Sequence, residues 1–200
     1  SKKWTRTLAQ HFINAGEKHN LDPTVLMAMA QKESTFRSKV TNPYGIKGMM
    51  QTSDSLAKKY GYKPSELYEA KVSIDVASRY LKSLKKTYGT YTMALCGYMY
   101  GGYNVSRGNY TKTYAWNVMN IRDGIKEYLK KEELANTSTG TRYVSGYCVN
   151  FRSEPDLESE VIDKLYRNTK LELLNECVGD FCRVQYKDAI GYMHKDYLSE

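Results

Sequence analysis

The sequence predicts a multi-domain α plus β chain, in which an all-α domain is followed by a small β-barrel. Apolar residues recur at helical spacing through the first 134 residues, and nothing there resembles a strong strand. The next segment, "ANTSTG", is small and polar without apolar periodicity. Short alternating runs typical of strands follow it. We therefore expect one domain over residues 1–134, a linker over 135–142 and a second domain over 143–200.

The first expected helix, over residues 3–19, carries Leu8, Phe12 and Ala15 on one apolar stripe. The second begins after Asp22, whose carboxylate can cap the first amides, with Pro23 at the first helical position. Its residues 25–30 are apolar on every side, which predicts a buried helix. Later helices are expected in the segment 52–61, around Pro64, and over 72–87, 93–100 and 111–133.

Glu33 stands at the exit of the buried helix. Leu26 and Met29 lie seven and four residues before it, so they share its face. Desolvation by these neighbours and the negative end of the helix dipole both disfavour a charged carboxylate. We therefore expect a raised pKa for Glu33. The alternative is a surface residue at a frayed helix end.

The loop "NPYGIKGMMQ" follows, with Gly45, Gly48 and Gln51. Glycines let backbone approach a partner closely, and exposed backbone groups suit a polyhydroxylated ligand. Glu-Ser followed by this loop resembles the lytic transglycosylases of the goose-type lysozyme superfamily, glycoside hydrolase family 23. The resemblance implies a lysozyme-like fold with Glu33 as the catalytic acid/base. It also implies a substrate-binding cleft formed by Ser34, Gly48, Met49, Met50 and Gln51.

The segment "ALCGYMYGGYN" corresponds to Ala-Leu-x-Ala-Tyr-Asn-Ala-Gly in that family. The resemblance implies that Tyr98 reaches the cleft, and that Tyr114 in "KTYAWNV" does the same. This chain departs from the pattern at Met99, where asparagine is usual, and at Tyr100, where alanine is usual. Ordinary core packing is the alternative for these tyrosines, because the chain has 19 of them.

The second domain shows at least five short strands, whose spacing predicts a small barrel. "VNFRSEP", "IGYMH" and the closing "YL" resemble bacterial SH3-like wall-binding domains, although Glu154 replaces the usual glycine. A wall-binding groove is expected to include Tyr147, Phe151 and Tyr192. Plain barrel core is the alternative for these three residues.

The chain has four cysteines, and their spacing does not match that of a metal site, so no metal and no cofactor are expected. Cys177 and Cys182 flank "VGDF", which indicates a hairpin tip where a cross-strand disulfide can form. Unpaired thiols are the alternative.

The charge is uneven: residues 1–134 contain 22 basic and 11 acidic side chains, and residues 135–200 contain 8 and 11. A basic domain suits an anionic polymer. No nucleic-acid motif is present, so nucleic acid is not expected as a partner. The longest apolar run, residues 25–30, is far too short to cross a membrane.

The two resemblances agree on peptidoglycan glycan strands as partner. Glycosidases generally use two carboxylates, yet we find no second acid placed like a partner of Glu33. A single acid suits a lytic transglycosylase that cleaves the MurNAc-GlcNAc β-1,4 bond and forms 1,6-anhydro-MurNAc ends. The alternatives are a hydrolytic goose-type lysozyme (muramidase), a catalytically silent wall-binding protein and, least favoured, a nucleic-acid binder.

The chain begins at Ser1 rather than Met, which indicates a processed or trimmed product, or a fragment of a longer protein. We expect a monomer that is secreted or wall-associated, of bacterial or phage origin.

Overall fold

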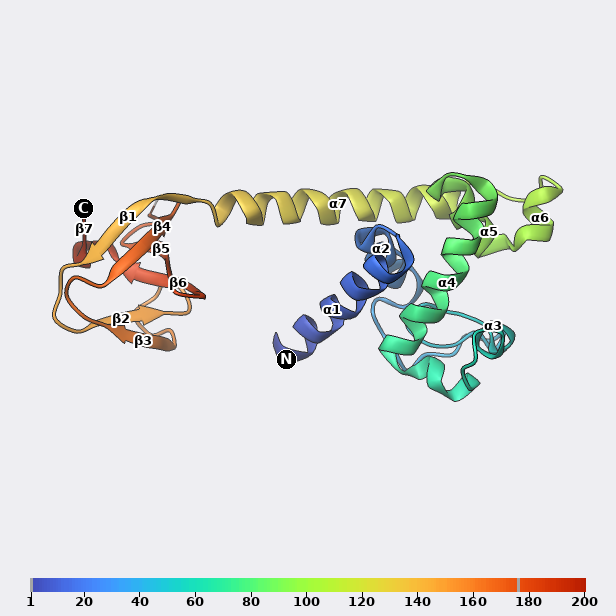
Figure 1. The fold of residues 1–200 in the computed structure, drawn as a ribbon, viewed down its shortest axis with the longest axis horizontal. Helices are drawn as coiled ribbons and strands as arrows, with labels where there is room; N and C mark the ends of the chain where they lie inside the picture. Colours follow the sequence, from blue (N-terminus) through green and yellow to red (C-terminus); the bar gives the residue numbers. More distant parts are fainter. Residues whose placement is uncertain (1, 176) are drawn as a thin grey trace. The chain divides into compact units, whose positions relative to one another are not determined.

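The computed structural model describes residues 2–175 and 177–200. The chain forms two compact units, residues 1–127 and 128–200 (Figure 1). The first unit is helical and the second is an antiparallel barrel, as the sequence predicted. None of the described helices is long and apolar enough to cross a bilayer.

The helical unit contains α1 (Lys2–His19), α2 (Pro23–Ser34), α3 (Asp54–Lys59), the 3-10 helix η1 (Pro64–Tyr68), α4 (Ala70–Tyr88), α5 (Tyr91–Tyr100) and α6 (Gly102–Ser106). The last helix, α7 (Thr113–Ala135), begins in this unit and ends in the second. The sequence missed α6. The expected helix over 93–100 ends at Gly101, with φ +78°, but Gly102 then starts another helix.

The buried helix α2 lies at the centre of this unit's core. Asp22 caps it by accepting a hydrogen bond from the Thr24 amide at 2.9 Å. Apart from the partly buried Met27, its apolar residues from Val25 to Ala30 are fully buried against side chains of α1, α4, α5, α7 and the α2–α3 loop. They include Val25, Leu26, Ala28, Met29 and Ala30.

A buried carboxylate ties α1 to α4. Burial alone would raise the pKa of Asp75, but hydrogen bonds from Lys18, His19 and Tyr62, with the charge of Arg79, lower it to about 2. The hydrogen bonds from Lys18 and His19 both measure 2.9 Å. Because the charge is compensated on several sides, Asp75 joins the two helices without an unpaired buried charge.

The second unit is a small barrel. Its strands are β1 (Ser138–Val144), β2 (Val149–Arg152), β3 (Val161–Leu165), β4 (Lys170–Leu174), β5 (Phe181–Tyr186), β6 (Ala189–His194) and β7 (Leu198–Ser199). Within the described residues the sheet order is β3-β2-β6-β5-β4-β1-β7, and every pair is antiparallel. The 3-10 helix η2 (Lys195–Tyr197) precedes β7. The core of the barrel is centred on Val144, Phe151, Leu171, Val184 and Met193.

The expected linker over residues 135–142 is much shorter in the structure. α7 continues to Ala135, and β1 already begins at Ser138, so Asn136 and Thr137 alone lie between them. Residues 138–143 pair with β4, and Thr137 Oγ1 donates to the Glu133 carbonyl at 3.1 Å. Backbone pairing therefore orders small polar residues whose composition alone suggests a loop.

Candidate functional site

The loop between α2 and α3 is held in one shape by its own backbone. Lys47 and Thr52 exchange two backbone hydrogen bonds, of 2.9 and 3.0 Å. Gly48 lies between them with φ +77°, and a Cβ added there would stand 1.9 Å from the Leu67 carbonyl oxygen. The close approach expected of Gly48 is thus made to η1, inside the protein. This glycine shapes the site rather than facing a ligand.

Three hydroxyl groups from three helices clamp this loop. Ser34 Oγ of α2 donates to the Met49 carbonyl at 2.8 Å. Ser73 Oγ of α4 accepts from the Met50 amide at 3.1 Å, and the Tyr98 hydroxyl of α5 donates to the Met50 carbonyl at 2.7 Å. We call these three residues the hydroxyl clamp. It fixes the Met49–Met50 backbone relative to the helix that carries Glu33.

Ser34 was expected to face the glycan, and the structure places it elsewhere. Ser34 is only 3% exposed. Its hydroxyl accepts a hydrogen bond from the Arg37 amide at 3.0 Å, in addition to the bond that it donates to the Met49 carbonyl. The Met49 and Met50 side chains are fully buried as well. The cleft is therefore supported from the protein interior by the buried side chains of Ser34, Met49 and Met50.

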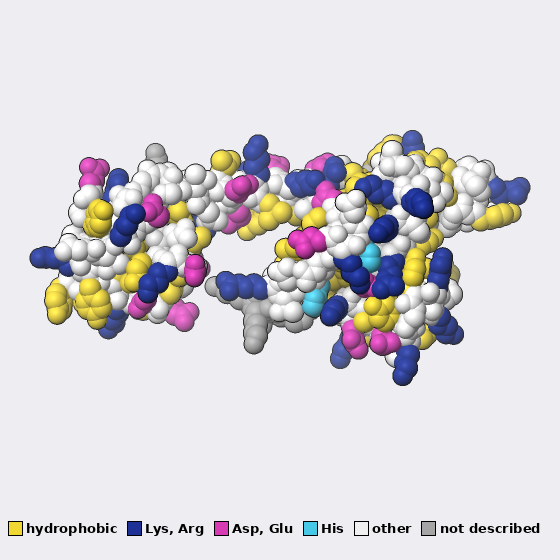
Figure 2. Space-filling view, viewed as in Figure 1, with side chains coloured by type: hydrophobic (Ala, Val, Ile, Leu, Met, Phe, Trp, Pro, Cys, Tyr) yellow, Lys and Arg dark blue, Asp and Glu magenta, His cyan; other side chains and the backbone are white. Residues whose placement is uncertain are grey.

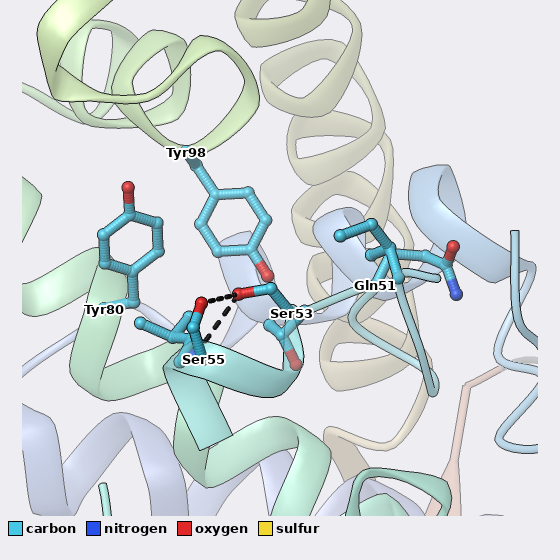
Figure 3. Close-up of a pocket in the computed structure, with 8 residues that line it drawn as sticks. Gln51, Ser53, Ser55, Tyr80 and Tyr98 are labelled. Atoms are coloured by element: carbon cyan, nitrogen blue, oxygen red, sulfur yellow. Dashed lines mark hydrogen bonds between the residues drawn. The ribbon is translucent and has the colours of Figure 1, made fainter. Parts of the chain in front are cut away.

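Gln51 adopts a left-handed backbone conformation with φ +47°. Its side-chain nitrogen donates to the Gly48 carbonyl at 2.9 Å. In Figure 3 this amide points away from Tyr98. The side chain expected to hold substrate is thus engaged in holding its own loop.

Glu33 lies half-buried in the last turn of α2. Desolvation by burial raises the pKa of its carboxyl, while the hydrogen bond from Tyr114 and the charge of Lys32 partly oppose that rise. The Tyr114 hydroxyl of α7 donates a hydrogen bond to Glu33 Oε1. A carboxyl with a raised pKa can hold a proton at a pH where ordinary glutamates have lost theirs.

Tyr98 and Tyr114 are both close enough to Glu33 for its charge to affect the pKa of their hydroxyls. Burial raises the pKa of each hydroxyl well above its ordinary value, and the nearby Glu33 charge raises it further. Both tyrosines therefore remain neutral hydrogen-bond donors. The structure brings together Glu33, Tyr98 and Tyr114 from α2, α5 and α7.

The environment of the Glu33 carboxyl is set by Tyr114, Lys32 and burial. None of the groups that shift its pKa is acidic. The next acid in sequence, Asp54, binds Lys47 Nζ through both carboxylate oxygens, at 2.6 and 2.7 Å. The site thus presents one protonatable carboxyl with a tyrosine on one of its oxygens.

A hollow of about 330 Å³ opens beside Tyr98. Tyr80 of α4 lies across from Tyr98, with ring centroids 5.6 Å apart and ring planes tilted by 41°. Ser53 and Ser55 also line this hollow (Figure 3). Tyr80 and Ser73 were not predicted as site residues, because both lie in α4, where most buried residues belong to the core.

The barrel residues expected in one groove are separated. Phe151 is fully buried in the barrel core, so it is not a binding residue. Tyr192 is half-buried in β6, whereas Tyr147 is 83% exposed. Tyr147 instead borders a hollow of about 250 Å³ with Phe181, His194 and Tyr197.

The structure joins Cys177 and Cys182 by a disulfide, while Cys96 is buried and free and Cys148 is exposed and free. Lys and Arg side chains are scattered over the visible face of the helical unit (Figure 2). In the described parts of the chain, no group of three or more His, Cys, Asp or Glu could hold a metal ion.

The family model "Transglycosylase SLT domain" matches residues 10–120, which is more than half of the chain. The chain belongs to the transglycosylase SLT domain family. This SLT match contains Glu33, the loop, the hydroxyl clamp and both tyrosines. The model "Bacterial SH3 domain" matches residues 149–199 of the barrel.

Two curated relatives support the assignment of this SLT protein. A transglycosylase of Enterobacteria phage PRD1 is 28% identical over 117 residues, which are 58% of this chain and 42% of the relative. The membrane-bound lytic murein transglycosylase F of Saccharophagus degradans is 36% identical over 74 residues, 37% of this chain and 14% of the relative. The chain thus spans less than half the length of either.

Solved structures support the same helical fold for the SLT protein. The 70 kDa soluble lytic transglycosylase Slt70 of Escherichia coli superposes with a TM-score of 0.55 and 21% identity, over 60% of this chain and 24% of that one. An inactive mutant of lytic transglycosylase Slt from Pseudomonas aeruginosa gives a TM-score of 0.54 and 17% identity over the same shares.

Proposed function

We propose that this chain is a peptidoglycan lytic transglycosylase with Glu33 as its single acid/base. One observation carries the proposal: a carboxyl with a raised pKa stands at the exit of a buried helix and accepts a hydrogen bond from Tyr114, and no acidic group contributes to that rise. The relatives, lytic transglycosylases of bacteria and a phage transglycosylase, support the same activity and substrate.

The proposed reaction cleaves the bond between C1 of N-acetylmuramic acid and the 4-oxygen of the following N-acetylglucosamine. Protonated Glu33 gives its proton to this bridging oxygen, and the C1–O bond breaks. The 6-hydroxyl oxygen of the same muramic acid ring then bonds to C1, and its proton passes to the Glu33 carboxylate. The acid is thereby regenerated, and no water is consumed.

The neighbouring residues support these two proton transfers. The Tyr114 hydroxyl stabilises the carboxylate form of Glu33 once its proton has left, and leaves Oε2 for the glycan. Apolar burial opposes this effect and keeps the acid protonated beforehand. The hydroxyl clamp holds the loop against α2, the helix that carries this carboxyl.

Mass spectrometry of digested sacculi tests the proposal. Anhydro ends are lighter than reducing ends by one water, so reducing ends would instead indicate a hydrolytic muramidase. We expect Glu33→Gln to retain the circular dichroism spectrum and lose nearly all muropeptide release. Glu17→Gln, at an exposed glutamate of α1, is the matched control and should release products normally. Substantial release by Glu33→Gln would refute the assignment of the acid/base.

We also propose that the barrel attaches the enzyme to the wall, which places the chain at the cell wall. Its hollow beside the exposed Tyr147 offers aromatic surface on which wall components can pack. The bacterial SH3 match to residues 149–199 supports this role.

A further inference from the structure

A separate hollow of about 260 Å³ lies where the turn between α1 and α2 meets the C-terminal end of α4. Lys82, Lys85 and Lys86 line it from α4, and residues 19–21 line it from the turn. We call these three lysines the lysine cluster. α2 begins just after this turn, and Glu33 lies near the other end of α2, about 15 Å away along the helix axis. The hollow is therefore distinct from the active-site cleft.

The lysine cluster has no negative partner of its own. None of its members forms an ion pair in the part of the chain that the structure describes. No acidic residue lines the hollow. Two acids of the adjoining elements bind other cations: Asp75 pairs with Lys18 and Arg79, and Asp22 pairs with Lys126 at 2.6 Å. Three positive charges thus border one hollow without compensation from these acids.

The dipole of α4 accounts for only part of this charge. Lys85 and Lys86 lie in the last turn of α4, whose carbonyl end attracts cations. This end corresponds to about half an elementary charge, and its effect falls off within the last turn. The dipole therefore compensates less than one of the three lysines and does not reach Lys82. An anion bound in the hollow can compensate the rest.

The cationic groups are partly arranged for a ligand in advance. Lys85 is half-buried, and its Nζ lies 4.2 Å from the centre of the Tyr91 ring, which restricts its motion. Lys82 and Lys86 are four residues apart, so they share one face of α4. Asn20, exposed in the turn with φ +53°, offers a side-chain amide as an additional donor. Less side-chain freedom is then lost when an anion binds.

The lining favours a phosphodiester chain over other anions. Lysine binds phosphate as a point charge, whereas arginine, which does not line this hollow, is suited to planar carboxylates. Peripheral membrane sites usually insert exposed apolar side chains, but Leu21 is buried. Single-stranded nucleic acid stacks its bases on open aromatic rings, but Lys85 covers the Tyr91 ring.

We propose that the lysine cluster binds a phosphodiester segment of an anionic polyol-phosphate polymer of the cell wall. This inference rests on the proposed function, which places the enzyme at the wall. The polymer would hold the catalytic domain on the side away from its cleft. Together with the barrel it would give two points of attachment, and simultaneous binding at both would slow release from the wall.

A triple variant of the full chain tests the proposal, with all three lysines of the cluster replaced by glutamine. The matched control replaces three exposed lysines outside the hollow by glutamine: Lys58, Lys71 and Lys130. Both triples lose the same net charge, and circular dichroism verifies that both fold. The probe is a synthetic glycerol phosphate oligomer, titrated by calorimetry at several salt concentrations. Polyglutamate, oligothymidylate and phosphatidylglycerol vesicles are compared at equal negative charge.

We expect the unaltered chain to bind the oligomer and to bind it less tightly as salt rises. The cluster triple should weaken binding about tenfold and flatten the salt dependence, since three surface ion contacts are lost. The control triple should weaken it no more than about twofold.

Equal losses in the two triples would overturn the proposal, because net charge alone would then explain the binding. So would the absence of oligomer binding. Equal or tighter binding of polyglutamate, oligothymidylate or the vesicles would overturn the assignment to a wall phosphodiester. The probe contains no glycan, so failure of the proposed cleavage reaction would appear only in the sacculus digest and would leave these titrations unchanged.

Discussion

Glu33 experiences two opposing influences at a single carboxyl group. Burial favours its protonated form, whereas the Tyr114 hydroxyl and the Lys32 charge favour its carboxylate. The net pKa is raised, so the folded chain binds this proton more tightly than the unfolded chain does. The acid therefore stabilises the fold at low pH, and this contribution is lost as pH rises through the folded-state pKa.

The stability of Glu33→Gln should consequently depend on pH relative to wild type. Glutamine cannot ionise, so it avoids the loss that Glu33 suffers as pH rises. We expect the melting temperature of the variant minus that of wild type to increase from pH 4 to pH 7. Thermal scans across this range measure the difference, with Glu17→Gln as control. A difference that falls with pH would mean that the carboxylate, not the acid, is the favoured form.

Gly45 and Gly48 separate backbone strain from steric exclusion within one loop. Both have positive φ, +75° and +77°, but a Cβ has open space at Gly45 and would clash with the Leu67 carbonyl at Gly48. We expect Gly45→Ala to lower the free energy of unfolding by about 1–2 kcal/mol, and Gly48→Ala to lower it considerably more. Urea unfolding measures both. Equal losses would show that η1 yields to the added methyl group.

At the scale of elements, the hydroxyl clamp bonds the α2–α3 loop to three helices, α2, α4 and α5. Each bond is made by a buried or half-buried group. Together they hold the carbonyl groups of Met49 and Met50 and the amide of Met50. Ser73 supplies the sole acceptor recorded for the Met50 amide in the described residues. The position of the loop relative to Glu33 thus depends on α4 as well as α2.

Ser73→Ala should weaken both the fold and the reaction. It leaves the buried Met50 amide without its acceptor, so we expect a loss of about 1–3 kcal/mol in the free energy of unfolding. A displaced loop should lower turnover of sacculi as well. Ser78→Ala, five residues further along α4, removes a hydroxyl without a partner and should cause neither loss. Full activity in Ser73→Ala would show that the clamp is dispensable for catalysis.

For the whole molecule, the sequence predicted what burial dictates. The apolar run of residues 25–30 had to lie mostly in the interior, where only Met27 is partly exposed, and the alternating strands had to form a sheet. Side-chain direction was less accessible: Ser34 turns inward because the Met49 carbonyl, fifteen residues away, needs a donor. Phe151 occupies the barrel core for the same kind of reason, because strand register decides which face it joins.

The division of labour between the two domains can be tested by removing the barrel. Residues 1–136 contain every group assigned to the chemistry, so this fragment should cleave short soluble glycans at nearly the full-length rate. It should sediment less with whole sacculi, because tethering raises the local enzyme concentration on the polymer. Lost activity on short glycans would show that the barrel helps to build the cleft, and equal sedimentation would refute wall attachment by the barrel.

The Cys177–Cys182 disulfide connects the barrel to the redox conditions of its surroundings. Such bonds persist in oxidising compartments and are reduced in the cytosol, so a wall-facing enzyme would acquire its bond only after export. The exposed thiol of Cys148 lies in the same domain and can form disulfides between molecules in air. Covalent dimers would imitate multivalent attachment to sacculi, so binding measurements require Cys148→Ser, whereas the structural pair must stay oxidised.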